Sequence, residues 1–231
     1  MQGGMNNELW LSHASEIEPQ MRLQERIWDE LHWESPADTT DVSVWVEDSV
    51  ATLTGTVPSY RARITIQEAT ERVRGVHGVL NQLSVVLPVA DSRSDSSLAA
   101  AVANALEWDI RVPHVRVSVR VEGGWVTLAG SVERQCQRSG AEDAVSHLTG
   151  VHGIRNEIVV EPAQGAPDLE RRVKDALDRV ELHGSHVSVE THDRSVTLRG
   201  RVHSLAERQT VERAVWGTPG VAGVEDLLTV R

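Results

Sequence analysis

The sequence has 231 residues, 40% hydrophobic and 25% charged, a composition that excludes a largely disordered chain and allows one large domain or two to three small ones. Its formal net charge of −11, without any run of basic residues, makes nucleic acid a poor partner, because phosphate backbones are repelled. The single cysteine, Cys136, excludes an intramolecular disulfide.

The N-terminal region shows neither the basic segment nor the apolar stretch of a signal peptide. No stretch approaches the roughly 18 apolar residues of a membrane span, so we expect no transmembrane segment. We expect a cytoplasmic protein, or a periplasmic one if an export signal precedes this sequence. Residues 1–20 are expected to form a loose or weakly helical tail.

A first structural unit is predicted over residues 21–88. Three apolar residues at helical spacing predict its first helix: Leu23, Ile27 and Leu31. The alternating run 42–46 predicts a half-buried strand, and a polar turn at 47–49 joins it to a second strand that ends at Gly55. These two strands should form a hairpin.

A second helix is predicted over about 59–74, followed by a glycine turn and a third strand near 81–86. The unit therefore has the order α-β-β-α-β. We predict an α+β fold in which a small three-stranded mixed sheet carries two helices on one face.

The same order occurs three times in the chain. A shift of 75 residues brings the first unit onto residues 95–162, and a further shift of 70 brings it onto 167–231. Polar or Pro/Gly-rich linkers separate the units. Nine positions of the first unit keep the same residue in the second unit, and all but two keep it in the third, where Thr191 and Asp226 stand in place of Val46 and Asn81: Val42, Val44, Val46, Leu53, Gly55, Val57, Gly75, Val76 and Asn81. The chain is therefore predicted to be a tandem array of three modules.

Two short motifs recur in register in the three modules. The second strand reads Ala51-Thr52-Leu53-Thr54-Gly55-Thr56-Val57, and related segments stand at 126–132 and 196–202. The turn before the third strand contains Gly-Val in every copy: Gly75-Val76, Gly150-Val151 and Gly220-Val221. With the αββαβ order, these motifs resemble the BON family, the bacterial OsmY and nodulation domain, over residues 21–231.

The resemblance implies a role without catalysis. BON domains are associated with envelope maintenance, osmotic stress and proposed phospholipid binding, and one relative senses potassium. Most characterised members are exported, whereas this sequence shows no export signal. No ligand residue is shared across the family, so the resemblance assigns none here.

The repeated glycines are interpreted as structural turn residues. Gly55, Gly130 and Gly200 end a strand, where a positive φ or close packing is expected. A second set ends the helices: Gly75, Gly150 and Gly220. A ligand that touches the backbone at the first set is the alternative.

No residue pattern indicates an active site. The sequence lacks a nucleophile elbow, a phosphate-binding loop and a zinc-protease motif. His183, His186 and His192 lie close in sequence, but no cysteine or second histidine cluster completes a zinc site. His147 lies eleven residues after Cys136, too far for a local dyad. We expect no catalytic residue, metal or cofactor.

The open face of each sheet is the candidate interaction surface. Strand alternation places Trp45 and Trp125 at near-equivalent positions opposite the helices. Two tryptophans at such positions predict a contact surface, either between modules or with a partner. The alternative is that both are simply exposed and make no contact. The third module has nearly balanced charge, and Arg199 and Arg201 flank Gly200, which makes it the best candidate for an anionic ligand, unless these charges only form a solvated surface.

We therefore predict a non-catalytic, stress-related binding or scaffold protein. Its modules would dock a protein partner through open sheet faces and turns. The alternative is a ligand sensor that binds phospholipid head groups or a monovalent cation such as potassium.

Overall fold

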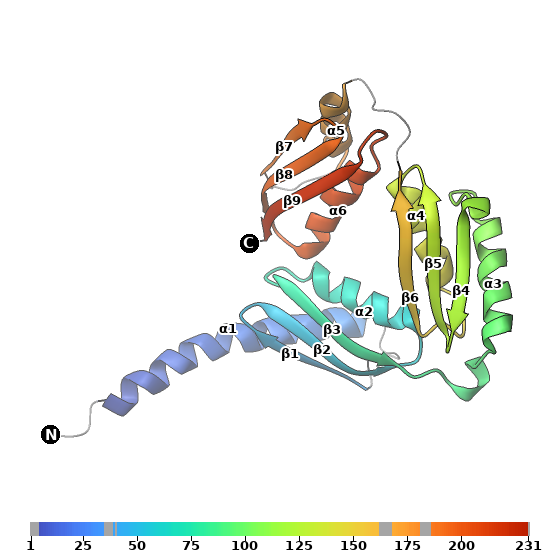
Figure 1. Cartoon of the computed structure of the whole chain (residues 1–231). Helices are drawn as coiled ribbons and strands as arrows, with labels where there is room; N and C mark the ends of the chain where they lie inside the picture. Colours follow the sequence, from blue (N-terminus) through green and yellow to red (C-terminus); the bar gives the residue numbers. More distant parts are fainter. Residues whose placement is uncertain (1–4, 35–38, 40, 162–167, 181–185, 231) are drawn as a thin grey trace.

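Three modules follow one another along the chain, each with a three-stranded sheet and two helices on one face (Figure 1). The computed structural model describes residues 5–34, 39, 41–161, 168–180 and 186–230, without the side chains of 5–19. Within these residues, no helix is long and apolar enough to cross a membrane.

Each module has the predicted order of helices and strands, which confirms the α+β fold. Module 1 contains α1 (Met5–Glu34), β1 (Val42–Glu47), β2 (Val50–Val57), α2 (Tyr60–Arg72) and β3 (Gly78–Val85). Module 2 contains α3 (Asp95–Trp108), β4 (Val117–Glu122), β5 (Trp125–Val132), α4 (Gln135–Ser146) and β6 (Gly153–Val160). Module 3 contains α5 (Leu169–Leu177), β7 (His186–His192), β8 (Ser195–Val202), α6 (Leu205–Trp216) and β9 (Gly223–Val230).

The second strand is central in every sheet. It pairs antiparallel with the first strand through the hairpin and parallel with the third, which returns after the second helix. In module 1 this pairing aligns Val44 with Leu53 and Leu53 with Asn81. The third strands begin three residues earlier than predicted, because Gly78 already pairs with Val50 although the sequence there resembles a turn.

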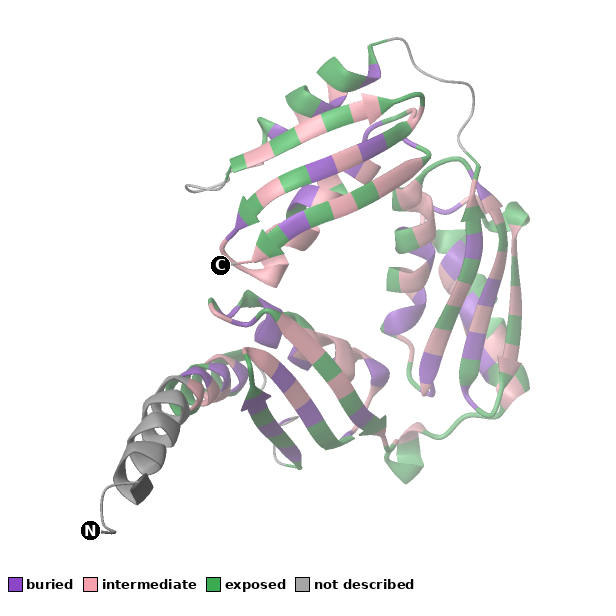
Figure 2. Ribbon diagram, turned by 60° about the vertical axis from the view of Figure 1, so that its left-hand side comes forward, coloured by how far each residue is buried: buried purple, intermediate pink, exposed green. Residues whose placement is uncertain are grey.

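Strand alternation directs one face of each sheet toward the helices. Val44 and Leu53 are buried, whereas Trp45 between the valines of β1 is exposed. Figure 2 shows buried residues alternating with less buried ones along the strands. The predicted apolar stripe of the first helix is buried against this face: Leu23, Ile27 and Leu31. Aliphatic residues therefore build one core for each module, as a chain without phenylalanine requires.

Two forms were expected for the N-terminal segment, a loose tail or a weakly helical one, and from Met5 onward the segment is helical. Helix α1 runs without interruption from Met5 to Glu34, across the predicted boundary at residue 20. The repeat marks only what the three copies share, and a helix with good helix-forming residues can extend beyond the shared unit. The side chains of residues 5–19 lie outside the described part of the structure.

A polar tie joins the second helix to the third strand in every module. The fourth residue of the helix is an arginine that hydrogen-bonds to an Asn or Asp in the strand; the pairs are Arg63 with Asn81, Arg138 with Asn156 and Arg208 with Asp226. The side-chain oxygen of the same strand residue accepts a backbone N–H two residues further on. The repeat in the sequence includes the Asn/Asp positions, but their arginine partners were not predicted.

Candidate functional site

The modules contact one another through their second helices. Figure 1 shows α2, α4 and α6 turned toward a common centre, with the sheets outside. These helices line a cleft of about 680 Å³. The modules therefore meet through helices and not through their open sheet faces, which was one of the expected arrangements. Trp45, on the open face of module 1, remains 66% exposed.

Tyr60 joins module 1 to module 2. It is the first residue of α2, after the N-cap Ser59, and it is only 8% exposed because it lies within the hydrophobic cluster of module 2. Ile64 and Val85 pack against the same cluster. Burial raises the pKa of the Tyr60 hydroxyl, and the nearby carboxylate of Glu142 raises it further.

Leu205 joins module 3 to module 1 in an equivalent way. It is the first residue of α6 and packs against the hydrophobic cluster of module 1. Beside it, Gln209 Nε2 donates to Glu71 Oε2 at 2.6 Å, and Gln67 Nε2 donates to Glu71 Oε1 at 2.9 Å. Glu71 is a buried carboxylate, and these two amides satisfy it.

These two junctions follow one rule. We call the first residue of each second helix the helix-start residue; the three are Tyr60, Gln135 and Leu205, which coincide under the shifts of 75 and 70. Module 3 inserts its helix-start residue into module 1, and module 1 inserts its own into module 2. Each contact is therefore heterologous, because different surfaces of the two modules meet.

The junction between α4 and α6, which we call the third junction, is not packed in this way. Its helix-start residue, Gln135, is polar. Among the described residues, the hydrophobic cluster of module 3 contains no side chain from another module. The cleft lies between all three second helices, lined by Tyr60 and Ile64 from α2, by Cys136 and Ser139 from α4, and by Arg213 and Trp216 from α6.

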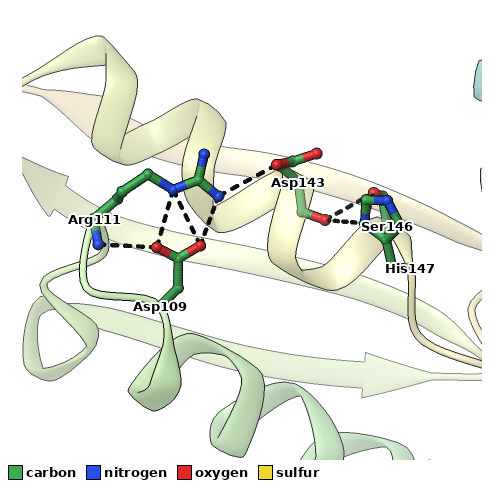
Figure 3. Close-up of polar contacts among 5 residues, drawn as sticks. All are labelled: Asp109, Arg111, Asp143, Ser146 and His147. Carbon is green, nitrogen blue, oxygen red and sulfur yellow. Dashed lines mark hydrogen bonds and ion pairs between the residues drawn. The ribbon is translucent and has the colours of Figure 1, made fainter.

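Arg111 braces the α4 wall of the cleft (Figure 3). Its Nη2 donates to Asp109 Oδ2 at 2.7 Å and to Asp143 Oδ2 at 3.3 Å. The side-chain hydrogen bond from Arg111 lowers the pKa of Asp109, and the same bonds raise the pKa of Arg111. This ion pair ties the loop after α3 to α4 and leaves Arg111 engaged with two carboxylates rather than available to an anionic ligand.

The open face of module 1 carries an exposed apolar row. Trp45 pairs with Thr52, and Thr52 pairs with Leu80 in the next strand. Trp45 is 66% exposed and Leu80 is 54% exposed. The row crosses all three strands of the sheet. Its two large apolar side chains, Trp45 and Leu80, therefore lie on the same open face, opposite the helices.

Trp125 lies at a different position in module 2. It belongs to the central strand and pairs with Glu122, whereas Trp45 belongs to an edge strand, so the two tryptophans are less equivalent than the sequence predicted. The offset of 75 aligns Trp45 with Arg120. Trp125 is 51% exposed and lines a hollow of about 350 Å³ with Arg120 and Arg155.

Module 3 presents the two predicted arginines on its open face. Arg199 and Arg201 are exposed on either side of Gly200. Arg199 Nε lies 3.9 Å from Glu190 Oε2, so a carboxylate of the neighbouring strand partly offsets its charge. The turn glycines Gly75, Gly150 and Gly220 all have positive φ.

No group of three or more potential metal ligands occurs among the described residues. His186 and His192 bound β7, and His183 lies outside the described residues. Cys136 is exposed near the start of α4, on the wall of the cleft.

Asp95 locks the β4–β5 turn of module 2. Its carboxylate accepts the backbone N–H of Gly123 at 2.8 Å and that of Gly124 at 2.9 Å. These bonds, that of Gly124 first, lower the pKa of Asp95 below its ordinary value of 3.8. The stabilisation of the turn by the ionised Asp95 carboxylate is therefore complete above pH 3.8, and it is lost as the pH falls through the lowered pKa.

We expect Asp95→Asn to accelerate hydrogen exchange at the Gly123 and Gly124 amides, because a neutral amide oxygen is a weaker acceptor. In the unchanged protein, the same amides should lose protection as the pH falls through the lowered pKa. NMR-detected exchange measures both effects, and the turn amides at 48–49 of module 1 are the internal control. Equal exchange rates of these two amides in the Asp95→Asn variant and in the unchanged protein would mean that Asp95 does not hold the turn.

A model of the BON domain matches the chain three times, at residues 21–86, 94–162 and 166–231. Osmotically-inducible protein Y of Escherichia coli (strain K12) is 30% identical over 128 residues. That alignment covers 52% of this chain and 62% of the relative, so it spans less than two thirds of the relative's length.

Two solved structures of CdsD, a structural protein of the type III secretion system of Chlamydia trachomatis, also match, each with a TM-score of 0.26 and 13% identity. The matches cover 88% and 91% of this chain, and 96% and 92% of the respective CdsD chains.

Proposed function

This chain belongs to the BON domain family, and from that premise we propose that it is a non-catalytic, stress-related scaffold whose open sheet faces dock a protein partner. The similarity to an osmotically inducible protein supports the connection with stress. The second helices face inward and bind the modules to one another, so the open faces of the sheets remain available outside (Figure 1).

The observation that carries this proposal is the apolar row of module 1. Soluble proteins rarely leave large neighbouring apolar side chains in water without a binding role. Trp45 and Leu80 stand on opposite edge strands with Thr52 between them, so they form one surface rather than isolated exposures. Large aromatic residues at the centre of an interface supply much of its binding energy.

The first test replaces Trp45 and Trp125 with serine, singly. We expect each variant to keep the stability of the parent, since neither ring lies in a hydrophobic cluster. We expect the Trp45 variant to lose roughly 2 kcal/mol or more of partner binding, as truncation of an interface anchor does. Quantitative mass spectrometry of proteins cross-linked to the full chain during osmotic stress measures the loss.

Trp108→Ser is the matched control, because Trp108 is 84% exposed but ends helix α3 instead of lying on a sheet. The proposal requires a set of proteins that Trp45→Ser loses and Trp108→Ser retains. Loss of the same proteins from all three variants, or from none, would contradict it.

One observation favours phospholipid head groups as a second candidate. Trp125 shares its hollow with Arg155 and with Arg120, whose charge is offset by an ion pair with Glu122 at 2.6 Å. An indole beside the Arg155 guanidinium suits a surface that carries phosphate. Co-sedimentation with phosphatidylglycerol vesicles tests this function. Attachment that Arg155→Gln weakens, and that high salt removes, would support head-group binding.

A further inference from the structure

We propose that the hollow between helix α1 and the β1–β2 turn of module 1 is a binding site for a small carboxylic acid. The hollow has a volume of about 350 Å³, and its walls include Arg22 and Arg26 of α1, Ser49 of the turn and Gly75. It lies on the helix side of the sheet. The inference therefore goes beyond the function proposed for the open faces and does not depend on it.

The first argument is that the equivalent turn of module 2 already binds a carboxylate. The two hairpins have two-residue loops, 48–49 and 123–124, and all four loop residues have positive φ. In module 2, the N–H groups of Gly123 and Gly124 donate to the carboxylate of Asp95 at 2.8 and 2.9 Å. These bonds favour the ionised carboxylate, and they lower the pKa of Asp95. A turn of this conformation is therefore a receptor for a carboxylate.

The second argument is that module 1 keeps the turn but lacks the tethered carboxylate. The offset of 75 aligns Asp95 with Gln20, which lines the hollow with a neutral amide. Among the described residues, no acceptor receives the backbone N–H of Asp48 or Ser49. Two donors that module 2 satisfies from its own chain thus border an open space in module 1.

The neighbouring glycine shows the same difference between the two modules. In module 2, the side chain of Arg93 lies beside Gly150, where a Cβ would approach it to 3.3 Å. The equivalent glycine of module 1 is Gly75, and it lines the hollow instead. Module 2 therefore fills with its own side chains the place that module 1 leaves for a ligand.

The third argument is the charge of the walls. Arg22 and Arg26 are one helical turn apart on α1, and the offset of 75 aligns them with the uncharged Ser97 and Ala101. Among the described residues, no acidic side chain lines the hollow, and Arg26 forms no ion pair. In a chain with a net charge of −11, two guanidinium groups beside two backbone donors favour an anionic ligand.

The size of the hollow limits the occupant to a small molecule. Pockets for small ligands typically measure roughly 300–1,000 Å³, and this hollow is at the lower end of that range. Succinate is a suitable probe, because it offers one carboxylate to the turn and a second one to the arginines.

The test is a titration of the full chain with succinate at constant ionic strength, followed by amide NMR. We expect the amide signals of Asp48 and Ser49 to shift and to saturate. The amides of Gly123 and Gly124 are the internal control, because Asp95 already occupies their turn. They should remain unchanged.

Two variants locate the site. Gln20→Asp introduces the carboxylate that module 2 carries, so it should compete with succinate and weaken its affinity about tenfold, whereas the neutral Gln20→Asn should bind like the parent. Arg26→Gln should also weaken binding about tenfold, because it removes a charge-assisted hydrogen bond.

Three results would overturn the proposal. One is the absence of a saturable shift at 48–49, or shifts of equal size at both turns. Another is an unchanged affinity in both Gln20→Asp and Arg26→Gln. The third is equal affinity for sulfate, which would mean that the hollow attracts anions in general and does not recognise a carboxylate. None of these outcomes depends on Trp45 or Leu80, so they do not bear on the proposed function.

Discussion

Gly130→Ala is expected to unfold module 2, with a loss of about 4 kcal/mol or more, a size typical of severe backbone conflicts. Gly130 has a φ of +137°, and a Cβ there would lie only 2.0 Å from the carbonyl oxygen of Arg116. That oxygen belongs to backbone beside the hairpin, so it cannot move away as a flexible side chain would. The strands would have to separate to admit the methyl group.

Hydrogen exchange resolved by mass spectrometry would follow each module separately in the Gly130→Ala variant. Peptides from 95–160 should lose protection while the sheets of modules 1 and 3 keep theirs. Gly123→Ala is the control: its φ of +57° is also positive, but a Cβ there would meet nothing within 4 Å. That change should cost about 1–2 kcal/mol. Equal effects of the two changes would mean that the close approach at Gly130 does not constrain the fold.

Tyr60→Ala is expected to separate module 1 from module 2. The ring is buried in the hydrophobic cluster of module 2, and removal of a buried aromatic side chain costs about 3–5 kcal/mol. The N-cap hydrogen bond from Ala62 N–H to Ser59 Oγ does not involve the ring, so α2 itself should persist. We expect the denaturant transition to split and the radius of gyration from X-ray scattering to increase.

Gln135→Ala is the matched control for that experiment, because Gln135 is the helix-start residue of the junction that is not packed. It should leave both the denaturation transition and the scattering unchanged. A single sharp transition in Tyr60→Ala, at the midpoint of the parent, would show that the ring does not hold the two modules together.

The Tyr60 hydroxyl adds a pH dependence to the same junction. Its pKa is raised above the ordinary value of 10.0, chiefly by burial, so the folded form disfavours the phenolate. The stabilising contribution is complete below the ordinary pKa and is lost as the pH rises through the raised value, because the unfolded chain ionises first. Tyr60→Phe should remove this alkaline loss while it keeps the aromatic ring, and scattering across that pH range would detect the difference.

The sequence by itself determined the modules. Helix and strand periodicity is local, so the alternation of Val42, Val44 and Val46 already showed which face of β1 is buried, and the repeat offsets showed that the unit recurs. The turn glycines were also visible, because few residues other than glycine adopt their backbone conformation. The same local patterns placed Trp45 and Trp125 on open faces.

Only the tertiary structure decided how the modules meet. Tyr60 and Leu205 read as ordinary helix residues, yet Tyr60 is buried in the core of module 2 and Leu205 packs, partly buried, against the core of module 1. Gln209 and Glu71 bond across 138 residues of sequence, and no local pattern encodes such a pairing. The choice of helices rather than sheets as the inner surface depends on how complementary shapes pack after each module has folded.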